Sequence, residues 1–140
     1  MEHLQIEISD RQSTADEIEL RDALYEYNCK ATGYRDGRLL SCFLKGDDGR
    51  LIAGISGYTW GGYAHVDYLW IAESFRRGGL GSRLLEAAEQ EARTRGCKTI
   101  VLDTHSFQAP DFYRRHEYAE AGMTRDTPVG YFQVLFQKSL

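Results

Sequence analysis

Residues 75–85 read FRRGGLGSRLL and join an apolar run to a helical pattern. The apolar run occupies residues 68–72, and apolar side chains recur at helical spacing from Leu80 to Arg95. We therefore expect a strand, a short basic glycine-rich turn and a helix. The first backbone N–H groups of a helix have no partner within it, and the positive end of the helix dipole reinforces them. The stretch predicts an anion site, most naturally one for a phosphate.

The glycine spacing excludes two common phosphate-binding motifs. A P-loop requires Lys-Ser or Lys-Thr after its last glycine, and neither pair follows here. The dinucleotide fingerprint requires G-x-G-x-x-G, whereas these glycines stand at positions 78, 79 and 81. A glycine-rich turn that carries solvated arginines is the plainer alternative.

Length and composition are those of one globular domain, expected over residues 1–140. Hydrophobic residues make up 42% and charged residues 27% of the chain, with a net charge of −4. The acidic balance argues against a nucleic-acid partner and suits a cationic small molecule such as an amine. The chain contains neither a run of 18 apolar residues nor a basic, apolar leader. We therefore expect a cytoplasmic protein without a membrane partner.

The three cysteines do not point to a metal or a disulfide. Cys29, Cys42 and Cys97 are odd in number, lie far apart and lack metal-ligand spacing. We expect them to be small buried side chains in a reducing compartment, with no metal site.

Apolar periodicity predicts a mixed α/β fold. Strands are expected at residues 4–8, 39–45, 51–59, 63–71, 99–104, 119–124 and 131–138, and helices at 15–28, 80–95 and 109–117. Turn residues join the three strands before the basic turn into antiparallel hairpins. The strand–helix–strand order after them predicts a parallel pair with a crossover. The fold class is thus a mostly antiparallel sheet with a central parallel βαβ unit, in which the last strand offers an exposed edge.

The helix at 80–95 has an expected buried stripe and an expected charged surface. Glu89–Arg93 and Glu91–Arg95 are predicted surface ion pairs at i,i+4 spacing. The stripe is expected to consist of Leu80, Leu84, Ala87, Ala88 and Ala92.

Two motifs resemble those of the GCN5-related N-acetyltransferase (GNAT) superfamily. Arg76-x-x-Gly79-x-Gly81 is similar to its R/Q-x-x-G-x-G/A pyrophosphate loop, and residues 109–118, APDFYRRHEY, are similar to its A-x-x-[FL]-Y-x-x-x-G-[FY] segment. Residues 102–110, LDTHSFQAP, further resemble an LD[ST]xSFQAPxFY run of small bacterial members. The resemblance covers essentially the whole chain. It departs at Glu117, where the family has a glycine that serves the turn into the next strand.

The resemblance implies an acetyl-CoA-dependent N-acetyltransferase that works by direct attack in a ternary complex. The end of strand 63–71 would pair with the pantetheine arm, and the glycine loop would hold the pyrophosphate, helped by arginine side chains. Aromatic and basic side chains after residue 106 would flank the thiol and adenine ends. The expected cofactor residues are Leu69, Trp70, Ile71, Arg76, Arg77, Gly78, Gly79, Leu80, Gly81, Ser82, Phe107, Phe112 and Arg115.

The chemistry needs an acid for the departing sulfur and a base for the amine. Tyr113 matches the family tyrosine and is the expected general acid, with packing over the cofactor as the alternative. Strand alternation places His65 and Asp67 on one face, where they are either the base or a plain polar surface. Glu73 is a weaker candidate for the base. Asp103 could be a buried carboxylate with a structural role.

The acceptor is expected to be the primary amine of a small molecule. Tyr58, Trp60, Tyr63 and Tyr68 would cage a cationic amine or be ordinary strand aromatics. The alternatives are a protein N-terminus or lysine as the acceptor, and an acyl-CoA-binding sensor without turnover. Many members of the superfamily are dimers, so the resemblance is also compatible with a homodimer.

Overall fold

The computed structural model describes residues 3–12 and 14–140, in two compact units at residues 1–34 and 35–140. The first unit contains helix α1 (Thr14–Thr32). The strand expected at residues 4–8 is wrong, because these residues form no strand and Leu4, Ile6 and Ile8 are exposed. Alternation produces a strand only where a neighbouring strand pairs with it, and none of the described strands does so.

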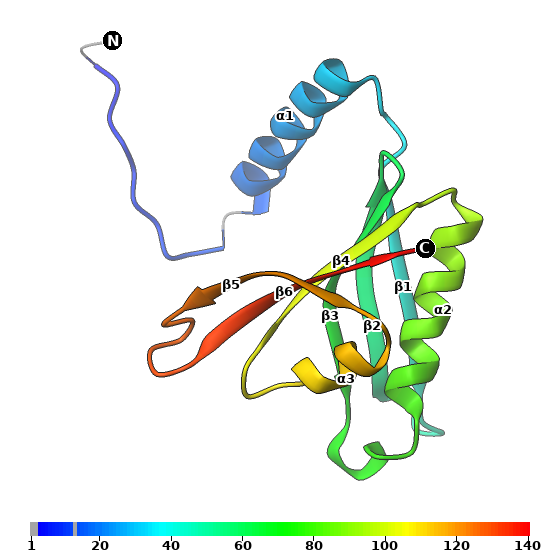
Figure 1. Cartoon of the computed structure of the whole chain (residues 1–140). Helices are drawn as coiled ribbons and strands as arrows, with labels where there is room; N and C mark the ends of the chain where they lie inside the picture. The colour runs from blue at the N-terminus through cyan, green and yellow to red at the C-terminus, as the bar shows by residue number, and fades with distance from the viewer. Residues whose placement is uncertain (1–2, 13) are drawn as a thin grey trace. The chain divides into compact units, whose positions relative to one another are not determined.

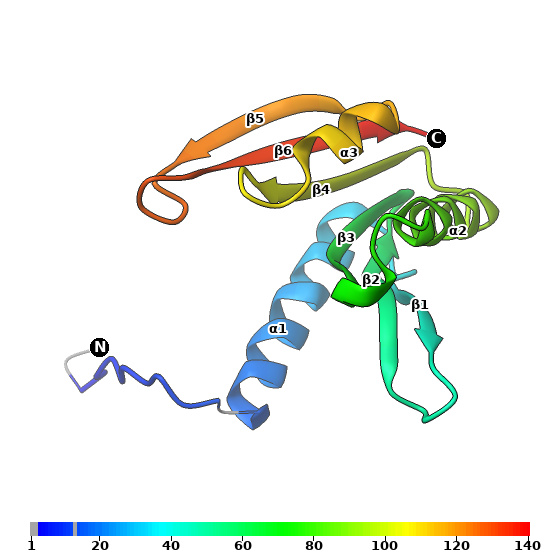
Figure 2. The same cartoon turned by 90° about the horizontal axis from the view of Figure 1, so that it is seen from below.

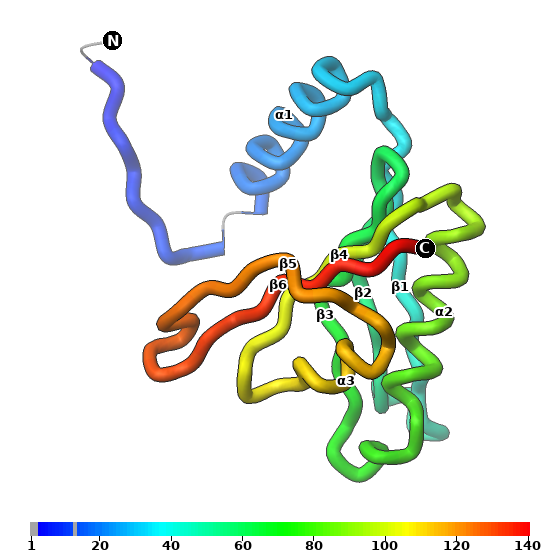
Figure 3. The backbone as a smooth tube through the Cα atoms, viewed as in Figure 1, coloured from blue at the N-terminus to red at the C-terminus, as the bar shows by residue number. Residues whose placement is uncertain are grey.

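The described part of the second unit is built on a six-stranded sheet (Figure 1). The strand order is β1-β2-β3-β4-β6-β5, with β3 and β4 parallel and the other neighbours antiparallel. Figure 3 follows the backbone from β3 through α2 to β4, which confirms the mixed α/β fold and its crossover. The elements are β1 (Arg38–Lys45), β2 (Leu51–Trp60), β3 (Tyr63–Ile71), the short 3₁₀ helix η1 (Glu73–Phe75), α2 (Leu80–Thr94), β4 (Thr99–His105), α3 (Pro110–Arg115), β5 (Ala119–Arg125) and β6 (Phe132–Ser139).

The last strand is not an edge of the sheet. β6 lies between β4 and β5, so the expected free edge at residues 131–136 is wrong. The hairpin between β5 and β6 was predictable from the turn residues. Which of its two strands would pair with β4 was not, because the strand order depends on contacts with a distant strand and not on the turn.

Helix α2 packs against β1, β2 and β3 and supplies much of the core. Three residues of the expected buried stripe are confirmed, namely Leu84, Ala88 and Ala92. Ala87 is exposed and Leu80 is half-buried. The ion pair Glu91–Arg95 is confirmed, with 3.1 Å between Oε1 and Nε. The buried residues of α2 are Gly81, Leu84, Leu85, Ala88, Glu89 and Ala92.

Glu89 is a buried carboxylate rather than a surface partner of Arg93. The Tyr118 hydroxyl donates to Glu89 Oε2 at 2.7 Å, and Lys138 Nζ lies 3.0 and 3.2 Å from the two carboxylate oxygens. The predicted ion pair with Arg93 is present at 3.9 Å, but its carboxylate is buried and not on the surface. A carboxylate is stable inside a protein only with such partners. Helical spacing alone could not reveal this, because Tyr118 and Lys138 come from distant parts of the chain.

The cysteines, the possible metal ligands and the helix composition can be checked over the described residues. Cys29 and Cys97 are buried free thiols, as predicted, and Cys42 is a half-buried free thiol. Among residues 3–12 and 14–140, no three His, Cys, Asp or Glu side chains gather as metal ligands. None of the described helices combines the length and apolar composition that a membrane span requires.

The turn after α3 contains Glu117 in a left-handed conformation, with φ +69°. The Glu117 N–H donates to Arg114 O and the Tyr118 N–H to Tyr113 O, as in a glycine-type helix end. A side chain in this conformation costs about 1 kcal/mol. We therefore expect Glu117→Gly to raise the free energy of unfolding by up to about 1 kcal/mol in urea titration. Glu117→Ala keeps the strained φ and should give no comparable gain; an equal gain would assign the effect to the lost carboxylate.

Strands β3 and β4 pair along only part of their length. The parallel register joins Tyr63–Val66 to Thr99–Leu102 and stops there. Figure 2 shows the two halves of the sheet, β1–β3 and β4–β6–β5, diverging from each other. The register between β2 and β3 also shifts, from Ser56↔Tyr68 to Gly57↔Val66, so that Asp67 is the extra residue of a β-bulge. The sheet therefore opens where β3 runs toward residue 71.

Candidate active site

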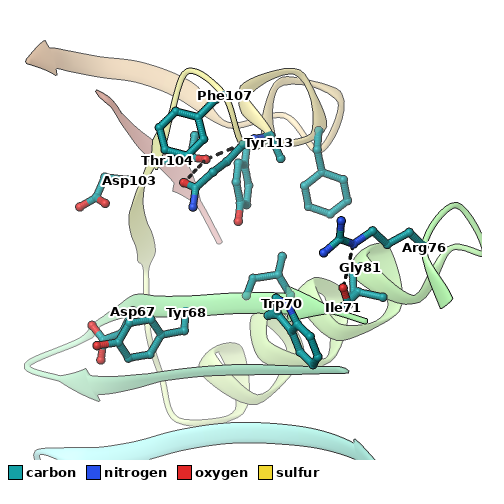
Figure 4. Close-up of a pocket in the computed structure, with 14 residues that line it drawn as sticks. Asp67, Tyr68, Trp70, Ile71, Arg76, Gly81, Asp103, Thr104, Phe107 and Tyr113 are labelled. Carbon is teal, nitrogen blue, oxygen red and sulfur yellow. Dashed lines mark hydrogen bonds between the residues drawn. The ribbon is translucent and has the colours of Figure 1, made fainter. Parts of the chain in front are cut away.

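A cavity of about 730 Å³ lies where β3 and β4 part (Figure 4). Nine of its lining residues were predicted as site residues, namely Asp67, Leu69, Trp70, Ile71, Arg76, Gly81, Phe107, Phe112 and Tyr113. The others are Tyr68, Asp103, Thr104, Gln108 and Ala109. The remaining predicted residues do not line the cavity; these are His65, Arg77, Gly78, Gly79, Leu80, Ser82 and Arg115.

One wall of the cavity is the unpaired edge of β3. The Ala72 N–H donates to Ile52 O at 2.8 Å, so residue 72 faces β2. Because backbone groups alternate in direction along a strand, those of Leu69 and Ile71 face the opposite side. The β4 register does not extend to these residues. The Ile71 carbonyl oxygen accepts from Arg76 Nε, and the other backbone groups of Leu69 and Ile71 on this side are available to an extended ligand that lies along β3.

The glycine loop presents backbone N–H groups at the start of α2. Arg77 (φ +65°) and Gly79 (φ +82°) both adopt left-handed conformations, and the first helical bond runs from Arg83 N to Gly79 O. None of the described residues accepts a hydrogen bond from the N–H groups of residues 77–82. Unpaired N–H groups at a helix N-terminus form a phosphate-binding site.

The side chains around this loop are partly engaged with the protein. Arg76 Nε donates to Ile71 O at 2.8 Å, which ties the loop to the end of β3 (Figure 4). Ser82 Oγ lies 2.8 Å from His116 Nε2, a contact that sequence reasoning did not find. Arg77 and Arg115 are exposed. The structure thus places the loop and the end of α3 side by side.

Tyr113 is buried on the opposite wall, and its hydroxyl points into the cavity (Figure 4). Its ring packs edge-to-face on Phe112 and Tyr118. Burial, and then the negative charge of Asp103, raise the pKa of Tyr113 to about 12. The hydroxyl donates to none of the described residues. A protonated phenol therefore faces the cavity without a protein partner.

His65 and Asp67 lie together, as alternation on β3 predicted. His65 Nδ1 and Asp67 Oδ1 are 2.8 Å apart. The imidazole stacks on Tyr58 with 5.4 Å between ring centroids, and Asp67 reaches the cavity wall. Glu73 lies in η1, exposed and outside the lining. The pair can pass a proton away from the cavity.

The four aromatic residues of the expected cage do not form one group. Tyr58 and Tyr63 share a hydroxyl contact of 3.2 Å, and Trp60 packs edge-to-face on Tyr63. Tyr68 is separate, largely exposed, and lines the cavity. Burial and the contact with Tyr63 raise the pKa of Tyr58.

Asp103 is exposed and lines the cavity, which rules out the alternative of a buried structural carboxylate. Alternation on β4 gives the reason, because Leu102 and Thr104 are the residues that point into the core. Gln108 is a second residue that sequence reasoning missed. Its Oε1 accepts from the His105 N–H at 2.8 Å and from Thr104 Oγ1 at 3.3 Å. The resemblance of the segment around it was a signal, but it assigned no role to the glutamine.

The chain was compared with known families and proteins. The model of the Acetyltransferase (GNAT) family matches residues 4–118. Acetyltransferase Atu2258 of Agrobacterium fabrum is 34% identical over 115 residues, covering 82% of this chain and 84% of the relative. Blasticidin-S acetyltransferase of Streptomyces morookaense is 41% identical over 96 residues, covering 68% of this chain and 71% of the relative.

Solved structures share the whole fold. The crystal structure of an acetyltransferase from Bacillus cereus ATCC 14579 has a TM-score of 0.82, 33% identity and full coverage of both chains. A structure from Agrobacterium tumefaciens has a TM-score of 0.89 and 30% identity, covering 98% of this chain and 100% of the other.

Proposed function

Because the chain belongs to the Acetyltransferase (GNAT) family, we propose that it transfers the acetyl group of acetyl-coenzyme A to the primary amine of a small molecule. That it is an N-acetyltransferase follows from the family; the acceptor and the roles of individual residues are the proposal. Blasticidin-S acetyltransferase, by its name, acts on a small molecule, which supports an acceptor of this size.

The polarity of the cavity carries the proposal. Figure 4 shows Arg76 and the glycine loop at one end, and Asp67 and Asp103 on opposite walls at the other end. Anionic phosphates favour the first end and a cationic amine favours the second. The Tyr113 hydroxyl lies in the same cavity. Donor and acceptor would thus approach from opposite ends and meet near this phenol.

The residues present fit acetyl-coenzyme A. The N–H groups of residues 77–82 would hold its pyrophosphate, and the unpaired edge of β3 at Leu69 and Ile71 would pair with its extended arm. Acetyl-coenzyme A supplies an acetyl thioester, whose carbonyl a β3 N–H would polarise.

The protein's own part in the reaction is proton transfer and orientation. An ammonium must lose a proton before its nitrogen can attack, and the His65–Asp67 pair would accept it, directly or through water. A neutral amine that attacks a thioester still has to lose a second proton from its nitrogen when the amide forms. Tyr113 would give its proton to the departing sulfur and would recover a proton through water, which takes up the second proton of the nitrogen.

The loop assignment is tested by Gly78→Leu. A Cβ at Gly78 would meet only Phe75 O, at 3.8 Å, so the fold should accept the side chain. The added side chain would occupy the space in which the pyrophosphate is expected. We expect the affinity for acetyl-CoA, measured by calorimetric titration, to fall by about tenfold or more.

Ala119→Leu is the matched control, because it adds a side chain to the exposed strand β5, away from the cavity. It should bind acetyl-CoA like the unmodified protein. Unchanged affinity in Gly78→Leu, with an unchanged melting temperature, would refute the loop assignment. A thiol-release screen with a panel of small amines then tests turnover, and turnover only with peptides would refute the small-molecule acceptor.

A further inference from the structure

We propose that Asp103 and the smaller cavity beside it form the acceptor site, in which Asp103 holds the ammonium group and the cavity takes an uncharged, partly apolar chain. The inference rests on the proposed function and narrows its substrate class to amines of this shape. Nothing in the family match assigns a role to these residues.

The smaller cavity adjoins the larger one at Asp103, one of the two carboxylates of the larger cavity. It has a volume of about 340 Å³ and lies on β4, β5 and β6. Asp103 lines both cavities. The other lining residues of the smaller one are Gly122, Met123, Thr124, Gln133 and Leu135.

The Asp103 carboxylate is oriented by a neutral partner. Gln133 Nε2 donates to Asp103 Oδ1 at 2.7 Å, which fixes the carboxylate without neutralising it. Within the described residues, no Lys, Arg or His forms an ion pair with Asp103. An oriented carboxylate without a cation is suited to bind an ammonium by charge-assisted hydrogen bonds.

The rest of the smaller cavity selects against a second charge. Met123 and Leu135 are about half exposed, at 55% and 43%, and present apolar surface. Thr124 Oγ1 is already engaged, lying 3.1 Å from Thr127 Oγ1. Such a surface offers no charged partner to a carboxylate or a second ammonium, whereas covering it with an apolar chain is favourable. An alkyl or otherwise uncharged chain fits best.

The position of Asp103 also suits the chemistry. Asp103 and Tyr113 line the same cavity, and the Asp103 charge contributes to the raised pKa of the Tyr113 phenol. Asp67 stands on the opposite wall at the same end of the larger cavity (Figure 4). An ammonium held at Asp103 can therefore pass its proton to the His65–Asp67 pair and present its free nitrogen within the larger cavity.

The test uses linear primary monoamines of increasing chain length, with thiol release as the assay and acetyl-CoA saturating. For the unmodified protein we expect kcat/KM to rise with chain length. Asp103→Asn keeps the shape of the side chain and should raise the amine KM by about tenfold to a hundredfold for every member. Its affinity for acetyl-CoA in calorimetric titration should stay unchanged.

Gly122→Leu tests the smaller cavity separately. Gly122 pairs with Leu135, so a side chain there projects from the same face, and its Cβ would meet no atom within 4 Å. Gly122→Leu should abolish the rise of kcat/KM with chain length and leave kcat/KM for the shortest amines nearly unchanged. Ala119→Leu, on the same strand but outside the cavity, should keep the gain.

Three results would overturn the proposal: no change of amine KM in Asp103→Asn, an unchanged chain-length dependence in Gly122→Leu, or no thiol release with any monoamine. Failure of the unmodified protein to bind acetyl-CoA would instead overturn the proposed function, so the two failures are distinguishable.

Discussion

Tyr113→Phe is expected to lower kcat by about a hundredfold to a thousandfold and to leave the affinity for acetyl-CoA nearly unchanged. The substitution removes one oxygen, and that oxygen donates to no described residue. The aromatic contacts with Phe112, Tyr118 and Phe136 remain. The loss should therefore appear in the chemical step, measured as kcat by thiol release, and not in the melting temperature.

The pH dependence follows from the direction of the Tyr113 shift. Burial and the Asp103 charge raise its pKa to about 12, so the phenol keeps its proton at neutral and mildly alkaline pH. In an unfolded chain the pKa of a tyrosine is about 10. Between these two pH values the folded state binds more protons than the unfolded state, so the contribution of Tyr113 to the free energy of unfolding falls as pH rises. The free energy of unfolding of Tyr113→Phe should therefore fall less at alkaline pH than that of the unmodified protein.

Tyr118→Phe is the matched control, since it removes the same atom from a ring 5.7 Å away. Its hydroxyl donates to buried Glu89, so the variant should lose about 1–3 kcal/mol of stability and keep most of its kcat. If Tyr113→Phe kept kcat within a factor of about three at every pH, its role would be packing and not acid catalysis.

The second unit was largely predictable because its signals are local. Periodicity located the hairpins, α2 and the parallel crossover to within one or two residues. What failed depends on contacts between distant residues. Glu89 is buried because Tyr118 and Lys138 reach it, and β6 lies inside the sheet because it pairs with both β4 and β5. No local pattern encodes either contact.

The candidate site also contains residues that local motifs reveal and residues that only the folded sheet brings to it. Residues within a motif, such as Arg76, Gly81 and Tyr113, could be found from spacing and resemblance, and the structure brings them to one cavity. Asp103 and Gln108 could not be assigned so easily. They reach the cavity because β4 parts from β3 beyond residue 102, which is a property of the sheet and not of either strand.

Gly57→Ala is expected to cost about 4 kcal/mol or more of folding free energy, the largest effect on stability that we predict. A Cβ at Gly57 would lie 1.8 Å from the His65 carbonyl oxygen and 3.0 Å from Val66 Cα. These are backbone atoms of β3 that cannot rotate away, so β2 and β3 would have to separate. The free energy of unfolding in urea, or the soluble yield if the chain fails to fold, measures the effect.

Gly54→Ala on the same strand is the control. Its Cβ would approach Phe43 Cδ1 at 3.0 Å, but the Phe43 side chain is exposed and can move, so the cost should be small. A melting temperature of Gly57→Ala close to that of Gly54→Ala would contradict the prediction. The contrast also bears on catalysis, because Gly57 stands at the bulge that makes Asp67 the extra residue of β3. The bulge places Asp67 in the cavity lining, and the pairing of β3 with β4 ends one residue before it, at Val66.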